Sequence, residues 1–305
     1  MAVDVAPPSR APHDPVLSVS RAFTRLTVMA LVCIALAAAI GYVFIDTNIG
    51  QALDDRALRG RVVQHAAARA DSNRLLQTIT NSSLALLGGA LMVVALLRGR
   101  WHLALAVGVV ILGSNVTTQL LKHGLDRPDL GEVMYRATLN TWPSGHTTVA
   151  ASLAAALVLV VPARARPLAA TVGAAYSGAI AVGVMAAGWH RPSDAAGAFA
   201  VVGAWTFGTT ALLVLWRGTG HPSHRASMPG LALGAIAVLG VAFVAMTVTT
   251  TINRAEGIEL VRLGAAYLVA ALALAVIAVA FVCSIVLALR GISLDSHPEA
   301  RRLAA

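Results

Sequence analysis

Long apolar runs separated by short polar segments dominate the chain. They lie at residues 26–45, 77–97, 103–121, 146–162, 168–188, 195–216, 230–250 and 263–289. Each is about long enough to cross a hydrocarbon layer of about 30 Å as a helix. The pattern predicts an all-α fold, a polytopic transmembrane helix bundle with about eight spans. The connections at 98–102 and 163–167 are so short that they predict antiparallel helical hairpins.

Three segments do not fit the pattern of apolar spans. Residues 1–25 are polar and contain proline, which predicts a mobile cytoplasmic tail. Residues 46–76 mix charges with many alanines, which predicts a periplasmic loop with a short surface helix lying against the headgroups. Residues 291–305 are expected to form a second cytoplasmic tail.

Composition narrows the class of protein further. The chain is 57% hydrophobic and 12% charged, and its mean hydropathy is +0.75. The net charge of +9 does not indicate nucleic-acid binding, because the arginines are spread in ones and twos between apolar runs. Cys33 and Cys283 both lie inside apolar runs far apart, so they predict neither a disulfide nor a metal site.

Arginines in the short loops predict the orientation of the chain in the membrane. Those on the side of the N-terminal tail are Arg98, Arg100, Arg164, Arg166, Arg217, Arg225, Arg290, Arg301 and Arg302. The positive-inside rule makes this side the cytoplasm, and we expect a multi-pass protein of the cell membrane. Trp142 and Trp189 are then expected at the outer interface as part of an aromatic belt.

Most of the chemistry lies in three short segments, at 121–128, 142–146 and 188–194. The only lysine of the chain, Lys122, is in the first of them. Charged groups beside apolar spans are costly unless they face one another or a polar ligand. All three segments lie at span ends on the face predicted to be periplasmic or extracellular, so we expect one shared site there.

The segment Trp142-Pro143-Ser144-Gly145-His146 immediately precedes an apolar run. Ser144 is predicted to cap the helix, whose free N–H groups and positive dipole end suit a phosphate. Capping and ligand contact are equally plausible for this serine, and both can hold. His146 falls in the first turn, where an imidazole can pass a proton to a leaving oxygen. The alternative is an incidental histidine at the interface.

His190 and Asp194 are four residues apart, and Pro192 between them favours the first turn of a helix. At that spacing the carboxylate can accept a hydrogen bond from one ring nitrogen and leave the other free to act as a nucleophile. The alternative is an interfacial histidine with an aspartate that stabilises the helix dipole.

Lys122, Arg127 and Arg191 supply positive charge for the non-bridging oxygens of a phosphate. Three cations and a helix N-terminus can stabilise a transferring phosphoryl group without a metal, so no cofactor is expected. A metal site is a weaker alternative, and it would use the neighbouring acidic residues Asp126, Asp129 and Glu132.

The order Lys…Arg-Pro, then Pro-Ser-Gly-His, then His-x-x-x-Asp resembles the type 2 phosphatidic acid phosphatase superfamily. That superfamily includes membrane lipid phosphatases and soluble vanadium haloperoxidases. The resemblance covers about residues 77–216 and implies a membrane phosphatase core with six helices within residues 26–216. Residues 217–290 would then add two further transmembrane helices.

The resemblance also implies roles for individual residues. His190 would be the nucleophile that forms a phosphohistidine, Asp194 its orienting partner, and His146 the acid for the leaving group. The residues that would hold the phosphate are Lys122, Ser144 and Gly145.

Two motifs depart from the superfamily pattern. An Arg-Pro usually follows the lysine by seven residues, where this chain has Asp129-Leu130, and Arg127-Pro128 lies two residues earlier. A Ser-Arg usually ends six residues before the histidine, where this chain has Gly183-Val184. We expect Arg127 and Arg191 to substitute for the two displaced arginines.

The expected function is hydrolysis of a phosphomonoester or pyrophosphate of a lipid at the outer leaflet. The partners are then a lipid phosphate substrate and membrane lipids, with no nucleic acid. Two alternatives are a lipid-linked phosphotransferase and a non-catalytic protein that binds or transports lipid on a degenerate scaffold. A soluble haloperoxidase is the weakest option. Gly230 and Gly234 have the spacing of a close helix contact, which makes a homo-oligomer possible.

Overall fold

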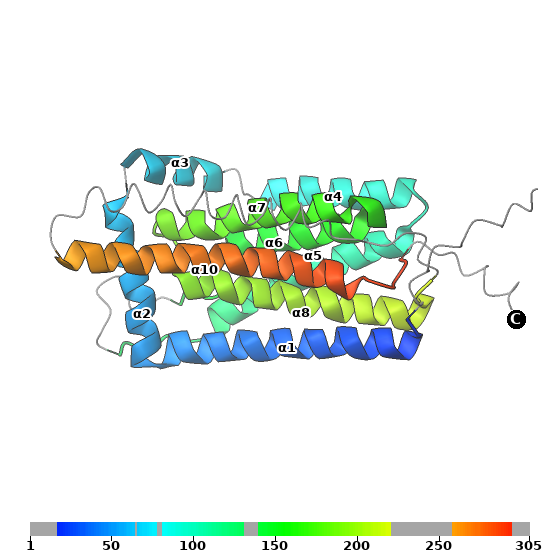
Figure 1. The fold of residues 1–305 in the computed structure, drawn as a ribbon, viewed down its shortest axis with the longest axis horizontal. Coiled ribbons are helices and arrows are strands. Elements are labelled where there is room, and N and C mark those ends of the chain that lie inside the picture. The colour runs from blue at the N-terminus through cyan, green and yellow to red at the C-terminus, as the bar shows by residue number, and fades with distance from the viewer. Residues whose placement is uncertain (1–16, 65, 78–80, 131–139, 221–257, 295–305) are drawn as a thin grey trace, which may run out of the picture.

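The computed structural model describes residues 17–64, 66–77, 81–130, 140–220 and 258–294. Within these residues the fold is a bundle of α-helices without strands, which confirms the predicted fold class. Long helices run side by side, and α2 lies across one end of the bundle (Figure 1). The predicted span at 230–250, with Gly230 and Gly234, lies outside the described residues, as do Arg225 and Glu132.

The helices follow the apolar runs of the sequence closely. They are α1 (Val19–Asp46), α2 (Asn48–Arg59), α3 (Ala66–Gln77), α4 (Asn81–Leu97), α5 (Trp101–Gly124), α6 (Gly145–Val160), α7 (Arg166–Ala186), α8 (Pro192–Arg217) and α10 (Ile258–Ala288), with 3-10 turns at Gly60–Val63 and Ala163–Ala165. Five of the described spans are long and apolar enough to cross a membrane, and α4 and α6 are shorter apolar helices. The total of eight spans stays a prediction.

Small side chains let the central helices approach closely. The helix pairs in closest association include α1 with α8, α6 with α7, and α10 with α7. Helix α6 is rich in buried alanines, and Gly173 of α7 lies so close to Ala154 that a Cβ atom added there would be 3.0 Å from the Ala154 Cβ. Since lipid tails are as apolar as leucine, close contact through small residues is a main source of helix association in a membrane.

The functional segments lie at the end of the bundle where α2 crosses it. The C-termini of α5 and α7 and the N-termini of α6 and α8 all lie there (Figure 1). The connections from α4 to α5 and from α6 to α7 lie at the opposite end, and both join antiparallel neighbours as predicted. Trp101 and Trp216 pack edge to face at that opposite end, with ring centroids 5.3 Å apart.

Two segments differ from the expectation drawn from the sequence. Helix α1 begins at Val19, so the last part of the predicted tail is helical. Arg25 stabilises this start because its guanidinium donates hydrogen bonds to the carbonyls of Ala288 and Arg290. Residues 46–76 form two helices instead of one short surface helix, and α2 packs against α1, α8 and α10. Its polar residues Gln51, Asp54 and Asp55 are therefore buried.

Candidate functional site

His190 is held at the turn between α7 and α8. Gly188 makes this turn possible with a φ of +77°, and the guanidinium of Arg61 packs so closely on it that a Cβ atom would be 2.4 Å from Arg61 Cζ. Helix α8 begins at Pro192, as predicted, and places Asp194 in its first turn. The Nδ1 atom of His190 lies 3.1 Å from Oδ2 of Asp194, so Nε2 is the nitrogen left for chemistry.

Asp194 is fully buried and organises the surrounding groups. Its Oδ2 accepts hydrogen bonds from the Thr141 hydroxyl at 2.6 Å and from the backbone N–H of Arg191 at 3.0 Å. Its backbone carbonyl accepts the Ser144 N–H at 2.8 Å. The second and third polar segments are thus joined directly through one residue, although they are far apart along the chain.

Ser144 caps helix α6, which confirms the predicted N-cap. Its hydroxyl accepts from the Thr147 N–H at 3.3 Å, and the helix starts at Gly145. A Cβ atom at Gly145 would lie 3.9 Å from Nζ of Lys122, so the lysine ammonium lies close to this helix terminus. The N-terminus of α6 and the only lysine therefore present positive charge to the same space.

His146 lies in the first turn of α6, on the same side of the site as His190. The two ring centroids are 6.4 Å apart, and the His146 ring also contacts Trp189, with centroids 5.2 Å apart. Both imidazoles are therefore close enough to contact one small group placed between them. This arrangement suits transfer from a nucleophile on one side to a leaving group on the other.

Arg127 is buried beside this group, at 4% exposure. None of its three guanidinium nitrogens has a hydrogen-bond partner among the described residues. It interacts electrostatically with Arg191 and with the carboxylates of Asp194, Asp54 and Asp55. Burial is the main cause that lowers the pKa of Arg127, and the neighbouring Arg191 lowers it further. A buried guanidinium in this state is costly, and an anionic ligand would satisfy it.

Arg191 is also buried, at 4% exposure, and its backbone N–H donates to Asp194. It lies near Arg127 and Asp194, since each of these interacts with it electrostatically. All eight predicted site residues therefore lie at one end of the bundle. Their individual roles stay predictions.

Helix α2 contributes two site residues that the sequence analysis missed. The carboxylate of Asp54 accepts hydrogen bonds from the backbone N–H of Ser193, at 3.1 Å, and from the Ser193 hydroxyl. Gln51 donates to the carbonyl of Pro128 at 2.9 Å and so fixes the loop that carries Arg127. Both are buried. Nothing in the sequence around Asp54 indicates that its carboxylate contacts the start of α8, which is more than a hundred residues away along the chain.

Asn140 and Thr141 were also missed, although they directly precede a predicted motif. The Asn140 amide donates weakly to the carbonyls of Leu121, Lys122 and Trp142 at 3.3–3.4 Å, and Asn140 Oδ1 accepts from the Trp142 N–H at 3.0 Å. These bonds tie the second segment to the end of α5. Their position just before Trp142 is a signal that could have drawn attention to them.

Trp142 is not part of an aromatic belt, so this expectation is wrong. Its side chain is 3% exposed and is wedged between α1 and α8, against Gly41 and Gly197. The missing Cβ atoms of these glycines make the room that the indole occupies. Trp189, at 39% exposure, is the more accessible of the two tryptophans.

The described part of the chain contains no group of three or more His, Cys, Asp or Glu side chains that could hold a metal ion. Asp126 and Asp129 of the alternative metal site are exposed, and Glu132 lies outside the described residues. Cys33 and Cys283 are both free thiols.

Comparison with known protein families identifies the central part of the chain. The family model of the PAP2 superfamily matches residues 103–219, from the start of α5 to the end of α8. Residues 103–219, here called the PAP2 segment, are therefore similar to the PAP2 superfamily. No curated protein and no solved structure matches the chain. The PAP2 segment contains all eight predicted site residues, whereas α1, α2 and α10 lie outside it.

The PAP2 segment indicates phosphatase-type chemistry, and the long apolar helices indicate a membrane protein. Together they suggest a membrane phosphatase. The residues that complete the site from outside the PAP2 segment, Gln51 and Asp54, come from α2.

Proposed function

We propose that this protein hydrolyses a phosphomonoester or pyrophosphate of a membrane lipid through a phosphohistidine intermediate. The observation that carries the proposal is the arrangement of two imidazoles around one space. His190 has its Nδ1 paired with Asp194 at 3.1 Å, and His146 faces it with a centroid separation of 6.4 Å. In this proposal His190 is the nucleophile, Asp194 orients its ring, and His146 is the acid, which are the three roles that phosphoryl transfer to a histidine requires.

The reaction would proceed in two steps. In the first, Nε2 of His190 attacks phosphorus, the bond from phosphorus to the leaving oxygen breaks, and His146 gives its proton to that oxygen. In the second, water attacks phosphorus and gives a proton to His146, the phosphorus–nitrogen bond breaks, and inorganic phosphate leaves. Asp194 stabilises the positive charge on His190 during both steps.

The phosphate oxygens would be held by positive charge and by helix N–H groups. Lys122 and the N-terminus of α6 at Ser144 and Gly145 provide one part of this binding site. Arg127 and Arg191 provide the other part. The guanidinium of Arg127 has no hydrogen-bond partner among the residues that the structure describes, which supports its assignment as a substitute for a displaced superfamily arginine. With this much positive charge the chemistry requires no metal.

A lipid substrate is supported by the position of the site at the ends of apolar helices. The short connections that carry Arg98, Arg100 and Arg164 lie at the opposite end of the bundle, and by the positive-inside rule they support an extracytoplasmic position of the site at the cell membrane. A headgroup at the membrane surface would then be within reach of His190, while its tail stays in the bilayer.

Phosphate release by purified protein tests this proposal. A panel of phosphatidic acid, phosphatidylglycerophosphate and polyprenyl pyrophosphate, each with and without chelator, should give release that His190→Ala abolishes and chelator leaves unchanged. The exposed His123 of α5 provides a matched control, and His123→Ala should retain activity. Lipid binding without release would support the non-catalytic alternative. Product linked to an added alcohol instead of free phosphate would support the phosphotransferase.

A further inference from the structure

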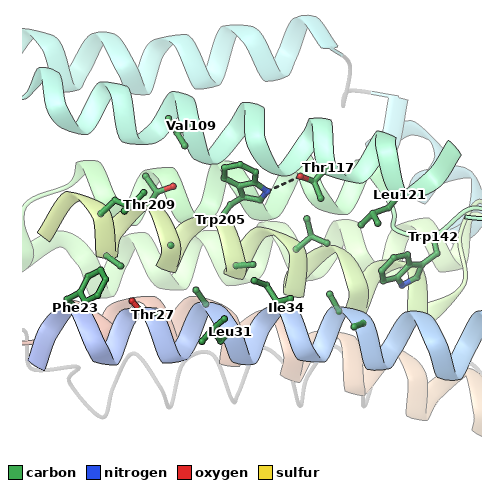
Figure 2. A pocket seen from close by; sticks show the side chains of 18 residues that line it. Phe23, Thr27, Leu31, Ile34, Val109, Thr117, Leu121, Trp142, Trp205 and Thr209 are labelled. Atoms are coloured by element: carbon green, nitrogen blue, oxygen red, sulfur yellow. Dashed lines mark hydrogen bonds between the residues drawn. The ribbon is translucent and has the colours of Figure 1, made fainter. Parts of the chain in front are cut away.

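A long apolar groove runs along the bundle between α1, α5 and α8, with a volume of about 750 Å³. Figure 2 shows its side chains, from Phe23 at one end to Trp142 at the other. The lining is almost entirely aliphatic and aromatic. Several residues along it are exposed, including Leu31, Ile34 and Leu212, so the groove opens on the side of the bundle.

The floor of the groove is largely apolar, and the threonines Thr27, Thr117 and Thr209 are its polar lining residues. Trp205 of α8 packs against the backbone of α5 at Gly113, where an added Cβ atom would lie 2.6 Å from the indole ring. Its N–H donates to the Thr117 hydroxyl at 3.0 Å, drawn as a dashed line in Figure 2. The one polar edge of the indole is therefore satisfied within the protein, and the ring gives the groove an apolar surface.

One end of the groove is lined by residues next in sequence to the candidate phosphate site, although no site residue itself lines it. Leu121 lines it and directly precedes Lys122, and Trp142 lines it two residues before Ser144. The other end lies far along the bundle. On α1 the lining extends from Phe23 to Ala38, about 22 Å at 1.5 Å per residue. The groove thus spans most of a hydrocarbon layer of about 30 Å, and one end lies at the helix ends that carry the site.

We infer that this groove binds the apolar tail of the phosphorylated lipid substrate, with the tail parallel to α8 and the phosphate beside Lys122. The inference rests on the proposed function and adds a binding site for the tail. Helix α1, which lies outside the PAP2 segment, forms one wall of it. The occupant is a hydrocarbon chain because the lining offers contacts of that chemistry over this length, and because Leu121 at one end directly precedes Lys122.

The groove contributes by orienting the substrate, and the transfer of the tail out of the bilayer contributes little. A tail in the bilayer is already in an apolar medium, so moving it into the groove gains little from the hydrophobic effect. Fixing the tail restricts where the headgroup can lie, and correct placement of reacting groups accelerates a reaction strongly. The groove should therefore favour long-tailed phosphates over tail-less ones in kcat/KM.

Gly208 is a suitable position at which a larger side chain would block the groove. It lines the groove on α8, and a Cβ atom added there meets no atom within 4 Å. Gly208→Phe should lower kcat/KM for a long-chain lipid phosphate at least tenfold and leave hydrolysis of a short, water-soluble phosphate such as p-nitrophenyl phosphate unchanged. Gly89 of α4 is the matched control because it lies outside the groove and also has no atom within 4 Å of an added Cβ. Gly89→Phe should leave both activities unchanged.

The outcomes separate the inference from the proposed function. If the unmodified protein hydrolyses neither phosphate, the proposed function fails. If it hydrolyses both and Gly208→Phe leaves their ratio unchanged, the groove does not hold the substrate tail, and bulk lipid or another occupant fills it. Gly208→Leu serves as a second, smaller block. Equal loss of both activities in both Gly208 variants would also overturn the inference, because the effect would then be structural.

Discussion

Arg127 shows most clearly at the scale of one residue why this site suits an anion. Its guanidinium is buried, none of its nitrogens has a hydrogen-bond partner among the described residues, and burial lowers its pKa. Its nearby carboxylates Asp54, Asp55 and Asp194 offset part of the cost of burying the charge, but they do not satisfy its N–H groups, which are costly to bury without partners. We propose that a phosphate accepts the hydrogen bonds of Arg127 and so offsets this cost.

Replacing Arg127 should therefore separate activity from stability. Arg127→Met should reduce kcat/KM for a lipid phosphate roughly ten- to a hundredfold, the loss expected for hydrogen bonds to a charged group. The midpoint of thermal denaturation in detergent should change much less, because the lost attraction to Asp54, Asp55 and Asp194 is offset by removal of a buried guanidinium without hydrogen-bond partners among the described residues. The exposed Arg56 of α2 is the control, and Arg56→Ala should change neither quantity. A lower midpoint with unchanged kcat/KM would make Arg127 a structural residue.

The site residues that could be predicted from the sequence are those with a local signal. His190 and Asp194 are four residues apart on a helix, and Ser144 precedes an apolar run, so spacing alone indicates their relation. Gln51 and Asp54 could not be predicted, because their partners Pro128 and Ser193 are distant in the chain. Trp142 was misplaced because burial between Gly41 and Gly197 depends on how α1 meets α8.

Helix α2 shows at the scale of an element how the site depends on residues outside the PAP2 segment. Asp54 binds the first turn of α8 at Ser193, next to Asp194. Burial and the nearby Asp194 raise the pKa of Asp54 from 3.8 to about 7, although its hydrogen bonds to Ser193 oppose the shift. We propose that Asp54 is a positioning residue, which acts on Asp194 through its hydrogen bonds to Ser193 at the start of α8.

Asp54→Asn should weaken the positioning of Asp194 and reduce the pH dependence of the protein's stability. Turnover should fall roughly tenfold, about the value of one hydrogen bond to a charged group. The pKa of Asp54 is higher in the folded protein than in the unfolded chain, so between about pH 4 and 7 the folded protein holds this proton and the unfolded chain does not. The contribution of Asp54 to stability is therefore lost as pH rises through that range. The thermal midpoint of the unmodified protein should fall more steeply over that range than that of Asp54→Asn.

The exposed Asp46 at the end of α1 provides the control for this comparison. Asp46→Asn removes a carboxylate at the same end of the bundle from an exposed position. It should retain both the turnover and the pH dependence of the unmodified protein. If Asp46→Asn and Asp54→Asn behave alike, the effect comes from net charge and Asp54 does not position the site.

The whole molecule could be predicted largely from the lengths of its apolar runs. Seven of the eight predicted spans coincide with described helices, and the two short connections join antiparallel pairs. Hydropathy predicts spans well because a membrane leaves few alternatives to a helix. The packing of α2 across the end of the bundle could not be predicted, because an amphipathic segment with mixed charge is equally compatible with the membrane surface.

Different helices of the bundle contribute different parts of the site and of the groove. Helices α5, α6 and α8 bring the three polar segments to one end, α2 closes that end, and α1 lines the groove beside it. The central claim is that this end of the bundle transfers a phosphoryl group to His190.

Direct detection of that intermediate is the sharpest test of the claim. Protein mixed with radiolabelled lipid phosphate should be quenched in denaturant at alkaline pH within the first turnover and mapped by mass spectrometry. We predict an acid-labile phosphate on His190, absent from His190→Ala and still present in His123→Ala. Steady phosphate release with no label on His190, or label that persists in His190→Ala, would contradict the account.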